Sequence, residues 1–550
     1  MRESMRGKMG RKLMAAAAVF SAVLLLLPMA GEARRKADSA VPKIIFVPHD
    51  NRPISNKQTA EVVEKLGYQV VTPPDEKLGN RTNLGNPEVL WQWLEENAGE
   101  AKAAVISSDA MLYGSLMGSR KHNYSQSEVM ERVEHFKEFR AAHPHMQLYV
   151  FSSIMRTPRN GEASGHEEPE YYRRYGADIF RYTGLKDKEE TEGLTQREKK
   201  EILFLERLIP KKDLQDWLGR RKKNYAATES LMRLAKGNVF NYMVLGRDDN
   251  APLSQTHMEN RHLMASAGTL DKSTFQAMAG IDEIGMLLMA RAVNDIKRDV
   301  PFVYVRYNWG RGGKTIPSYS DETMEASISA AINVGGGMQV STPEKADLVL
   351  AVNTNPNGKT YEASDRKNDG RSREGTDYFA DLVSDYVSKG YPVAIADVAY
   401  ANGADNTLIE NLKKKELLFK LKAYAGWNTP TNSSGFVIGE GMLVKHMKDE
   451  AAHNLLITRY LDDWAYQANV RNTIARQLTW LRGDGVYGSL DDKRQAVSDR
   501  SSRLMTQFMA HNFPHLASLK EIEVYFPWNR MFEADIVHAE ELHPMDYLKH

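Results

Sequence analysis

The chain has 550 residues, too many for one ordinary hydrophobic core, so about two or three domains are expected. Hydrophobic residues make up 42% and charged residues 26%, a globular composition that excludes extensive disorder. The formal charge is +1, so no global field attracts nucleic acid, and none is expected as a partner. Cysteine is absent, which excludes disulfides, a thiol nucleophile and cysteine metal ligands.

The N-terminus has the order of a secretory signal peptide. Basic residues that include Arg6, Lys8, Arg11 and Lys12 precede an apolar run from Leu13 to Ala30, and small residues follow it. An uncleaved anchor is the alternative, because the run approaches the roughly 20 residues that span a bilayer. Pro28 and the small residues near Ala33 favour cleavage. We therefore predict a signal peptide at residues 1–33, a secreted or cell-envelope location, and no membrane span after cleavage.

Residues 41–298 alternate apolar runs with helical spacing, which indicates a parallel sheet covered by helices. Four strands that end in polar residues favour a (β/α) barrel-like N-terminal domain. A doubly wound open sheet is the alternative, and periodicity does not separate the two. Strands are expected at 43–47, 68–72, 103–107, 147–152 and 239–245, and helices at 57–66, 90–98, 127–142, 257–267 and 283–294.

A second, smaller α/β domain is expected at 299–445, and a mainly helical segment at 446–550. The second domain has strand patterns at 301–307, 347–353 and 392–397, with helical patterns at 322–334, 378–388 and 407–412. A late strand is expected at 521–526.

Polar side chains follow four of the strands of the first domain. Because parallel strands share their carboxyl ends, these side chains are expected to converge on one active or binding site. The predicted substrate-binding residues are Asp50, Asn51, Arg52, Asp109, Tyr113, Arg156, Arg247 and Asn250, and the predicted catalytic residues are Asp248 and Asp249.

The pair Asp248-Asp249 carries the predicted chemistry. In an extended backbone the two side chains diverge, so each can address a different atom of one substrate. One orients a substrate group, and the other is a general acid whose pKa is raised by burial beside a like charge. Two-carboxylate glycosidases need this division. Two structural alternatives are that Arg247 neutralises one aspartate, or that the polar loop caps the next helix.

Other patterns in the sequence have weaker functional interpretations. Asp282 and Glu283 open a helical pattern, where acidic residues are favoured by the helix dipole, so capping is predicted for them. The stretch N-W-G-R-G-G-K-T at 308–315 lacks the first glycine of a phosphate-binding loop and is interpreted as a loop. The carboxylates Asp50, Asp109 and Asp248 could hold Ca²⁺ or Mg²⁺, although the prediction includes no metal and no cofactor.

Six motifs together resemble a large bacterial family catalogued only as a domain of unknown function. They are V-P-H-D-N-R-P, S-D-A-M-L-Y-G-S-L-M-G-S-R, V-L-G-R-D-D-N-A-P, A-D-V-A-Y-A-N-G-A-D, Y-A-G-W-N-T and F-P-W-N-R. The resemblance covers nearly the whole chain after the signal, and it implies a bacterial exported protein; it assigns no activity and no catalytic residues.

A second, local similarity concerns only the strand that ends in Asp248-Asp249. Substrate-assisted β-N-acetylhexosaminidases with barrel folds also place adjacent acids at a strand end, the first as proton donor and the second orienting the acetamido group. The similarity implies that Asp248 is the acid and Asp249 the orienting residue.

The resulting hypothesis is an exported glycosidase-like hydrolase whose substrate is a glycan. The alternatives are a hydrolase with a carboxylate-bound metal and a non-catalytic cell-wall glycan-binding or envelope protein.

Overall fold

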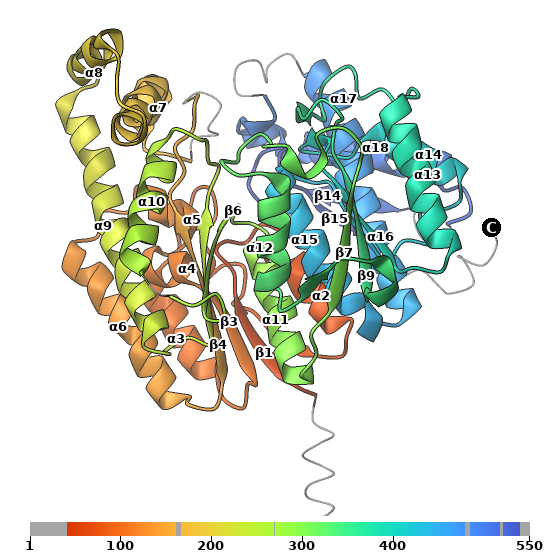
Figure 1. Ribbon diagram of the computed structural model, residues 1–550, viewed down its shortest axis with the longest axis horizontal. Coiled ribbons are helices and arrows are strands. Elements are labelled where there is room, and N and C mark those ends of the chain that lie inside the picture. Colours follow the sequence, from red (N-terminus) through yellow and green to blue (C-terminus); the bar gives the residue numbers. More distant parts are fainter. Residues whose placement is uncertain (1–40, 161–166, 269, 479–484, 517–520, 539–550) are drawn as a thin grey trace, which may run out of the picture.

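The computed structural model describes residues 41–160, 167–268, 270–478, 485–516 and 521–538. The predicted signal peptide lies outside these ranges. The α/β class is confirmed, since the described chain forms two parallel sheets with helices on their faces, followed by a mainly helical C-terminal region. Figure 1 shows the two sheets side by side, with helices between them.

The first sheet has six parallel strands in the order β2-β1-β3-β4-β5-β6. It is open, with β2 and β6 at its edges, so the barrel prediction is wrong and the doubly wound alternative is correct. The physical reason is that the chain leaves β6 to begin a second sheet and does not return to pair with β2. The strands are β1 (Lys43–Val47), β2 (Gln69–Val71), β3 (Ala103–Ser107), β4 (Gln147–Ile154), β5 (Tyr242–Arg247) and β6 (Phe275–Ala279).

Both faces of the first sheet are apolar, as the near-continuous hydrophobic strands predicted. Alternate side chains such as Ile45 and Ile106 pack against helices on the outer face, while Phe46 and Val105 pack on the inner face. The outer helices are α3 (Pro87–Asn97), α4 (Ser108–Tyr113), α6 (Gln126–Ala142) and α9 (Lys211–Lys236).

The second sheet has five parallel strands in the order β13-β11-β9-β7-β8. They are β7 (Phe302–Tyr307), β8 (Met338–Val340), β9 (Leu348–Asn353), β11 (Val393–Asp397) and β13 (Ala423–Ala425). Its outer face is covered by α13 (Glu374–Ser388), α14 (Asn406–Lys414) and the C-terminal helices, which include the π-helix Tyr460–Val470 and α18 (Arg494–Asn512). The late strand is found as β14 (Ile522–Tyr525).

One hydrophobic core joins the inner faces of both sheets. It is built around α11 (Ile284–Lys297), which packs on the first sheet, and α15 (Pro430–Leu443), which packs on the second. Every residue of α15 is buried. Because α11 and α15 also pack on each other, the two sheets are held at a fixed relative position (Figure 1).

Some elements have weak sequence patterns and were not predicted. The strands β6, β8 and β13 are either edge strands or only three residues long, so they lack a long apolar run. Helix α15 is buried all round and carries several small residues, so it has no amphipathic period. No helix in the described ranges combines the length and apolarity needed to cross a membrane.

The close contact of α11 and α15 depends on Gly439. A Cβ atom there would lie 3.1 Å from the carbonyl oxygen of Met286. We expect Gly439→Leu to lower the free energy of unfolding by about 1–3 kcal/mol, measured by urea denaturation, because a fixed backbone lies in the way.

The matched control is Gly219→Leu on α9, where an added Cβ would contact nothing within 4 Å. It should be neutral or slightly stabilising, because glycine is a poor helix former. Equal losses in the two variants would show that the helix contact does not need glycine.

Candidate functional site

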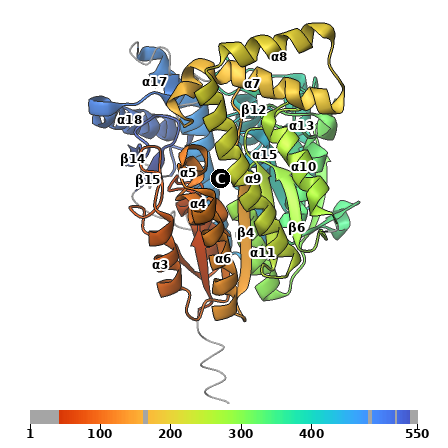
Figure 2. The ribbon, with the colours of Figure 1, turned by 90° about the vertical axis from the view of Figure 1, so that its left-hand side faces the viewer.

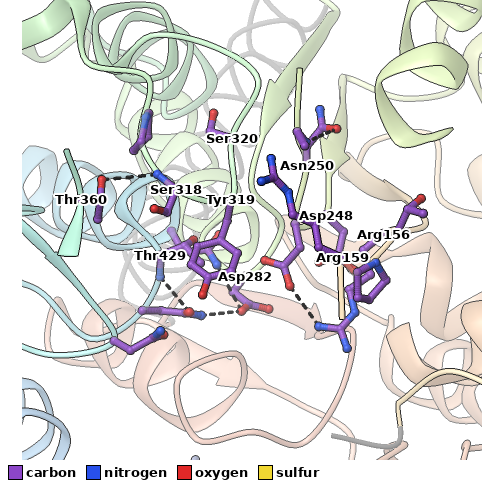
Figure 3. Close-up of a pocket in the computed structure, with 18 of the residues that line it drawn as sticks. Arg156, Arg159, Asp248, Asn250, Asp282, Ser318, Tyr319, Ser320, Thr360 and Thr429 are labelled. Atoms are coloured by element: carbon purple, nitrogen blue, oxygen red, sulfur yellow. Dashed lines mark hydrogen bonds and ion pairs between the residues drawn. The ribbon is translucent and has the colours of Figure 1, made fainter. Parts of the chain in front are cut away.

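A polar cavity of about 810 Å³ lies at the carboxyl ends of both sheets. In open α/β sheets, ligands bind where the strand order reverses, which here is between β1 and β3 and between β7 and β9. Segments after strands of both sheets line the cavity. The first sheet contributes Arg52, Leu116, Arg120, residues 156–160, residues 248–252 and Asp282; the second contributes residues 316–320, residues 358–361, Asn402, Asn428, Thr429 and Asn432. Figure 3 shows Asp248 and Arg156 on one side and Ser318 and Thr360 on the other.

The loop after β5 places Asp248 and Asp249 in the cavity. They bind different arginines: Asp248 accepts a hydrogen bond from Arg120 Nη2 at 2.6 Å, and Asp249 accepts one from Arg156 Nη1 at 3.0 Å. Asp249 has a φ of +30°, a strained conformation for a residue with a Cβ. Such strain is concentrated at functional sites, where the surrounding contacts maintain it.

The two aspartates differ in exposure. The Asp248 side chain is buried, whereas that of Asp249 is 31% exposed. Removal from bulk water, together with the charge of Asp248, raises the pKa of Asp249 to about 6, although Arg156 opposes this shift. Asp249 can therefore carry a proton near pH 6.

Three arginines converge on one carboxylate. Glu167 accepts from Arg120 Nη1 at 2.5 Å and forms ion pairs with Arg156 at 2.9 Å and Arg530 at 2.6 Å. Arg156 is also bound to Glu168 Oε1 at 2.6 Å. Buried guanidinium groups need such partners, because an unpaired buried charge is strongly destabilising.

Arg52 is the centre of a second cluster. It donates hydrogen bonds to both carboxylate oxygens of Asp50 and to Asp282 Oδ1, the latter at 2.6 Å. Its Nη2 also lies 2.8 Å from His49 Nε2. Burial alone would raise the pKa of Asp282, but the Arg52 charge holds it well below its usual range. Asn428 from the second sheet donates to Asp282 at 2.9 Å. The capping prediction for Asp282 and Glu283 is therefore wrong: neither caps α11 with its side chain, and Asp282 lines the cavity.

Five of the ten predicted site residues line the cavity: Arg52, Arg156, Asp248, Asp249 and Asn250. The other five lie behind it or beside it. Asp50 accepts a hydrogen bond from Arg52, and Asn51 accepts one from Trp528 Nε1 at 2.8 Å. Asp109 accepts a hydrogen bond from the Ser153 amide at 3.1 Å, and Tyr113 stacks on His122. Arg247 binds Asp321 and Glu322.

Four residues of the two clusters were not predicted as site residues: Arg120, Glu167, Asp282 and Arg530. Arg120 and Arg530 are the last residues of two motifs, S-D-A-M-L-Y-G-S-L-M-G-S-R and F-P-W-N-R, so the family resemblance contained a signal for them. Glu167 lies in a region without strand signals, and its pairing depends on distant segments.

Metal binding has no ready ligand set in the part of the chain that the structure describes. No group of three or more histidine and acidic side chains is arranged there to hold an ion. The three aspartates considered for a metal have separate partners: Arg52 for Asp50, the Ser153 amide for Asp109, and Arg120 for Asp248.

Fold and site together define an α/β protein with two open parallel sheets that share one charged cavity at their carboxyl ends. Within this class the chain belongs to the family described as "Protein of unknown function (DUF4127)", whose model matches residues 44–537. This confirms the resemblance to a domain of unknown function. No curated protein matches the sequence.

Asp109 gives a pH-dependent prediction. Burial raises its pKa to about 7 in the folded state, against about 3.9 in the unfolded chain. Between these values the unfolded state loses its proton first, so the free energy of unfolding falls as pH rises. Asp109→Asn does not titrate and can still accept the Ser153 hydrogen bond. Its stability relative to wild type should rise by at most about 1.4 kcal/mol per pH unit from about pH 4 to about pH 7.

The measurement is urea unfolding of both proteins across this pH range. The exposed Asp492→Asn serves as control and should follow wild type at every pH. Parallel curves for wild type and Asp109→Asn would mean that Asp109 is ionised throughout, contrary to the raised pKa.

Proposed function

We propose that this protein is a carbohydrate-active hydrolase, glycosidase-like, that acts on a glycan through Asp248 and Asp249. The observation that carries the proposal is the differing environment of two adjacent carboxylates in one polar cavity. Asp249 is partly exposed and its pKa is raised to about 6, while Asp248 is buried and bound to Arg120. Paired titratable groups with divergent environments are typical of acid and base assignments.

The roles of the two aspartates are proposed in the reverse order from that implied by the hexosaminidase similarity. Asp249 gives its proton to the leaving-group oxygen as the glycosidic bond breaks. Asp248 is held in place by Arg120 Nη2 at 2.6 Å. It accepts a hydrogen bond from the acetamido N–H of the substrate or from the attacking water.

The remaining lining suits a hydroxyl-rich substrate. Neutral donors and acceptors include Ser318, Thr360 and Thr429, and the aromatic side chains of Tyr319 and Tyr361 lie at the same cavity. Aromatic faces stack on the apolar faces of sugar rings, while hydroxyl and amide groups bind sugar hydroxyls. Export to the cell envelope also belongs to this proposal, on the predicted signal at residues 1–33.

The test is release of chromophore from a panel of aryl glycosides, including N-acetylhexosaminides, with and without chelator. We expect turnover that survives the chelator and falls on the order of 10²–10⁴-fold in both Asp248→Asn and Asp249→Asn. In wild type, activity should decline as pH rises through about 6, because the proposed acid loses its proton there.

Asp381→Asn, on the exposed side of α13, is the control and should keep full activity. Loss of activity to the chelator would favour the metal-dependent hydrolase. Glycan binding without turnover, unchanged by either substitution, would favour a binding protein.

A further inference from the structure

Two helices project beside the carboxyl ends of the first sheet. They are α7 (Glu170–Thr191) and α8 (Gln196–Leu208), which lie at the upper edge of the molecule in Figures 1 and 2. On its inner face α8 buries Ile202 and Leu205 in a small core shared with α7. Among the residues that the structure describes, none buries the outer face of α8 in this way.

The outer face of α8 is apolar at its centre. Leu203 is 54% exposed, Phe204 61% and Leu208 42%. Together with Lys200 and Arg207 they follow the spacing i, i+3, i+4, i+7, i+8, so these five side chains form one continuous stripe along the helix. We name this stripe the α8 face.

The charge around the α8 face is mainly positive. Two of the three acidic residues of α8 are paired with bases, Glu198 with Lys188 at 2.6 Å and Glu201 with Arg181 at 2.7 Å; Glu206 accepts a hydrogen bond from the neutral Tyr182 hydroxyl at 3.1 Å and keeps its negative charge. Six exposed basic side chains on and next to α8 have no carboxylate within ion-pair distance among the residues that the structure describes: Arg197, Lys199, Lys200, Arg207, Lys211 and Lys212. These local basic side chains are not evident from the formal charge of +1 for the whole chain.

We propose that the α8 face docks on the surface of an anionic lipid bilayer. Exposed leucine and phenylalanine side chains flanked by unpaired bases are typical of helices that lie in a membrane interface, where acyl chains cover the apolar groups and lipid headgroups balance the charge. A symmetric contact with a second copy would place the same bases opposite one another. A bilayer supplies both the apolar cover and the negative charge.

Docking through α8 also positions the cavity. Helix α7, against which α8 packs, contributes Phe180 to the cavity lining. A bilayer bound at α8 therefore lies on the side of the molecule where the cavity is. Substrate attached to the membrane or resting on it would then lie near the cavity.

The experiment is sedimentation with vesicles of the protein beginning at Arg34, which contains every described element. Vesicles are phosphatidylcholine alone or with about a quarter phosphatidylglycerol. We expect wild type to bind the anionic vesicles, and to bind them less at about 0.5 M salt than at about 0.1 M because the attraction is screened. Leu203→Ser/Phe204→Ser and Lys199→Gln/Lys200→Gln/Arg207→Gln should each weaken binding about tenfold or more.

The matched control is Met338→Ser on the edge strand β8 of the second sheet, an equally exposed apolar side chain outside the α8 face; it should bind as wild type. Thermal unfolding of each variant verifies the fold. Equal binding of wild type to both vesicle types, or wild-type binding by the Leu203→Ser/Phe204→Ser variant, would overturn the proposal. So would concentration-dependent self-association of the wild type, lost in that variant, without vesicle binding.

Discussion

Buried arginine charge is the constraint on which the cavity depends. Arg52, Arg120 and Arg530 are buried and the Arg156 side chain is only 12% exposed, and a guanidinium cannot lose its proton to escape the cost of burial. Each must therefore be met by carboxylates in defined geometry. The carboxylates come from strand ends, from Glu167 and from the C-terminal region, so segments far apart in sequence are fixed against one another. The same pairing leaves Asp249 as the partly exposed acid.

The second sheet forms the other wall of the cavity and is tied to the first close to the aspartate pair. Arg247, at the end of β5, binds Asp321 in the loop after β7 at 3.0 Å, and the Asn250 amide donates to the Tyr319 carbonyl at 3.0 Å. Arg247 thus neutralises neither Asp248 nor Asp249. It positions the loop that carries Ser318 and Tyr319, while the α11–α15 contact fixes the sheets beneath.

The sequence predicted the strands well because buried parallel strands are short apolar runs; β1 and β3 were predicted with their observed bounds. Convergence of the strand ends followed from parallel pairing, and it correctly brought Arg52, Arg156 and Asp248 together. Whether the sheet closes into a barrel could not be predicted from the sequence, because a barrel and an open sheet share the same βα pattern. Asp282 was misassigned for a related reason. An acid before a helix is favoured by local electrostatics, and only the tertiary fold brings Arg52, 230 residues away in sequence, to bind it.

The strained backbone at Asp249 links this geometry to chemistry. A positive φ at a residue with a Cβ persists only when contacts on both sides over-determine it. Here Gly246 permits the close approach of β5 to the Gly280 carbonyl, where a Cβ would lie 2.5 Å from the oxygen, and Arg156 holds the Asp249 carboxylate from the other side. Arg156 in turn is held by Glu167 and Glu168. Asp248 and Asp249 thus lie as two like charges in one cavity, and the Asp248 charge contributes to the raised pKa of Asp249.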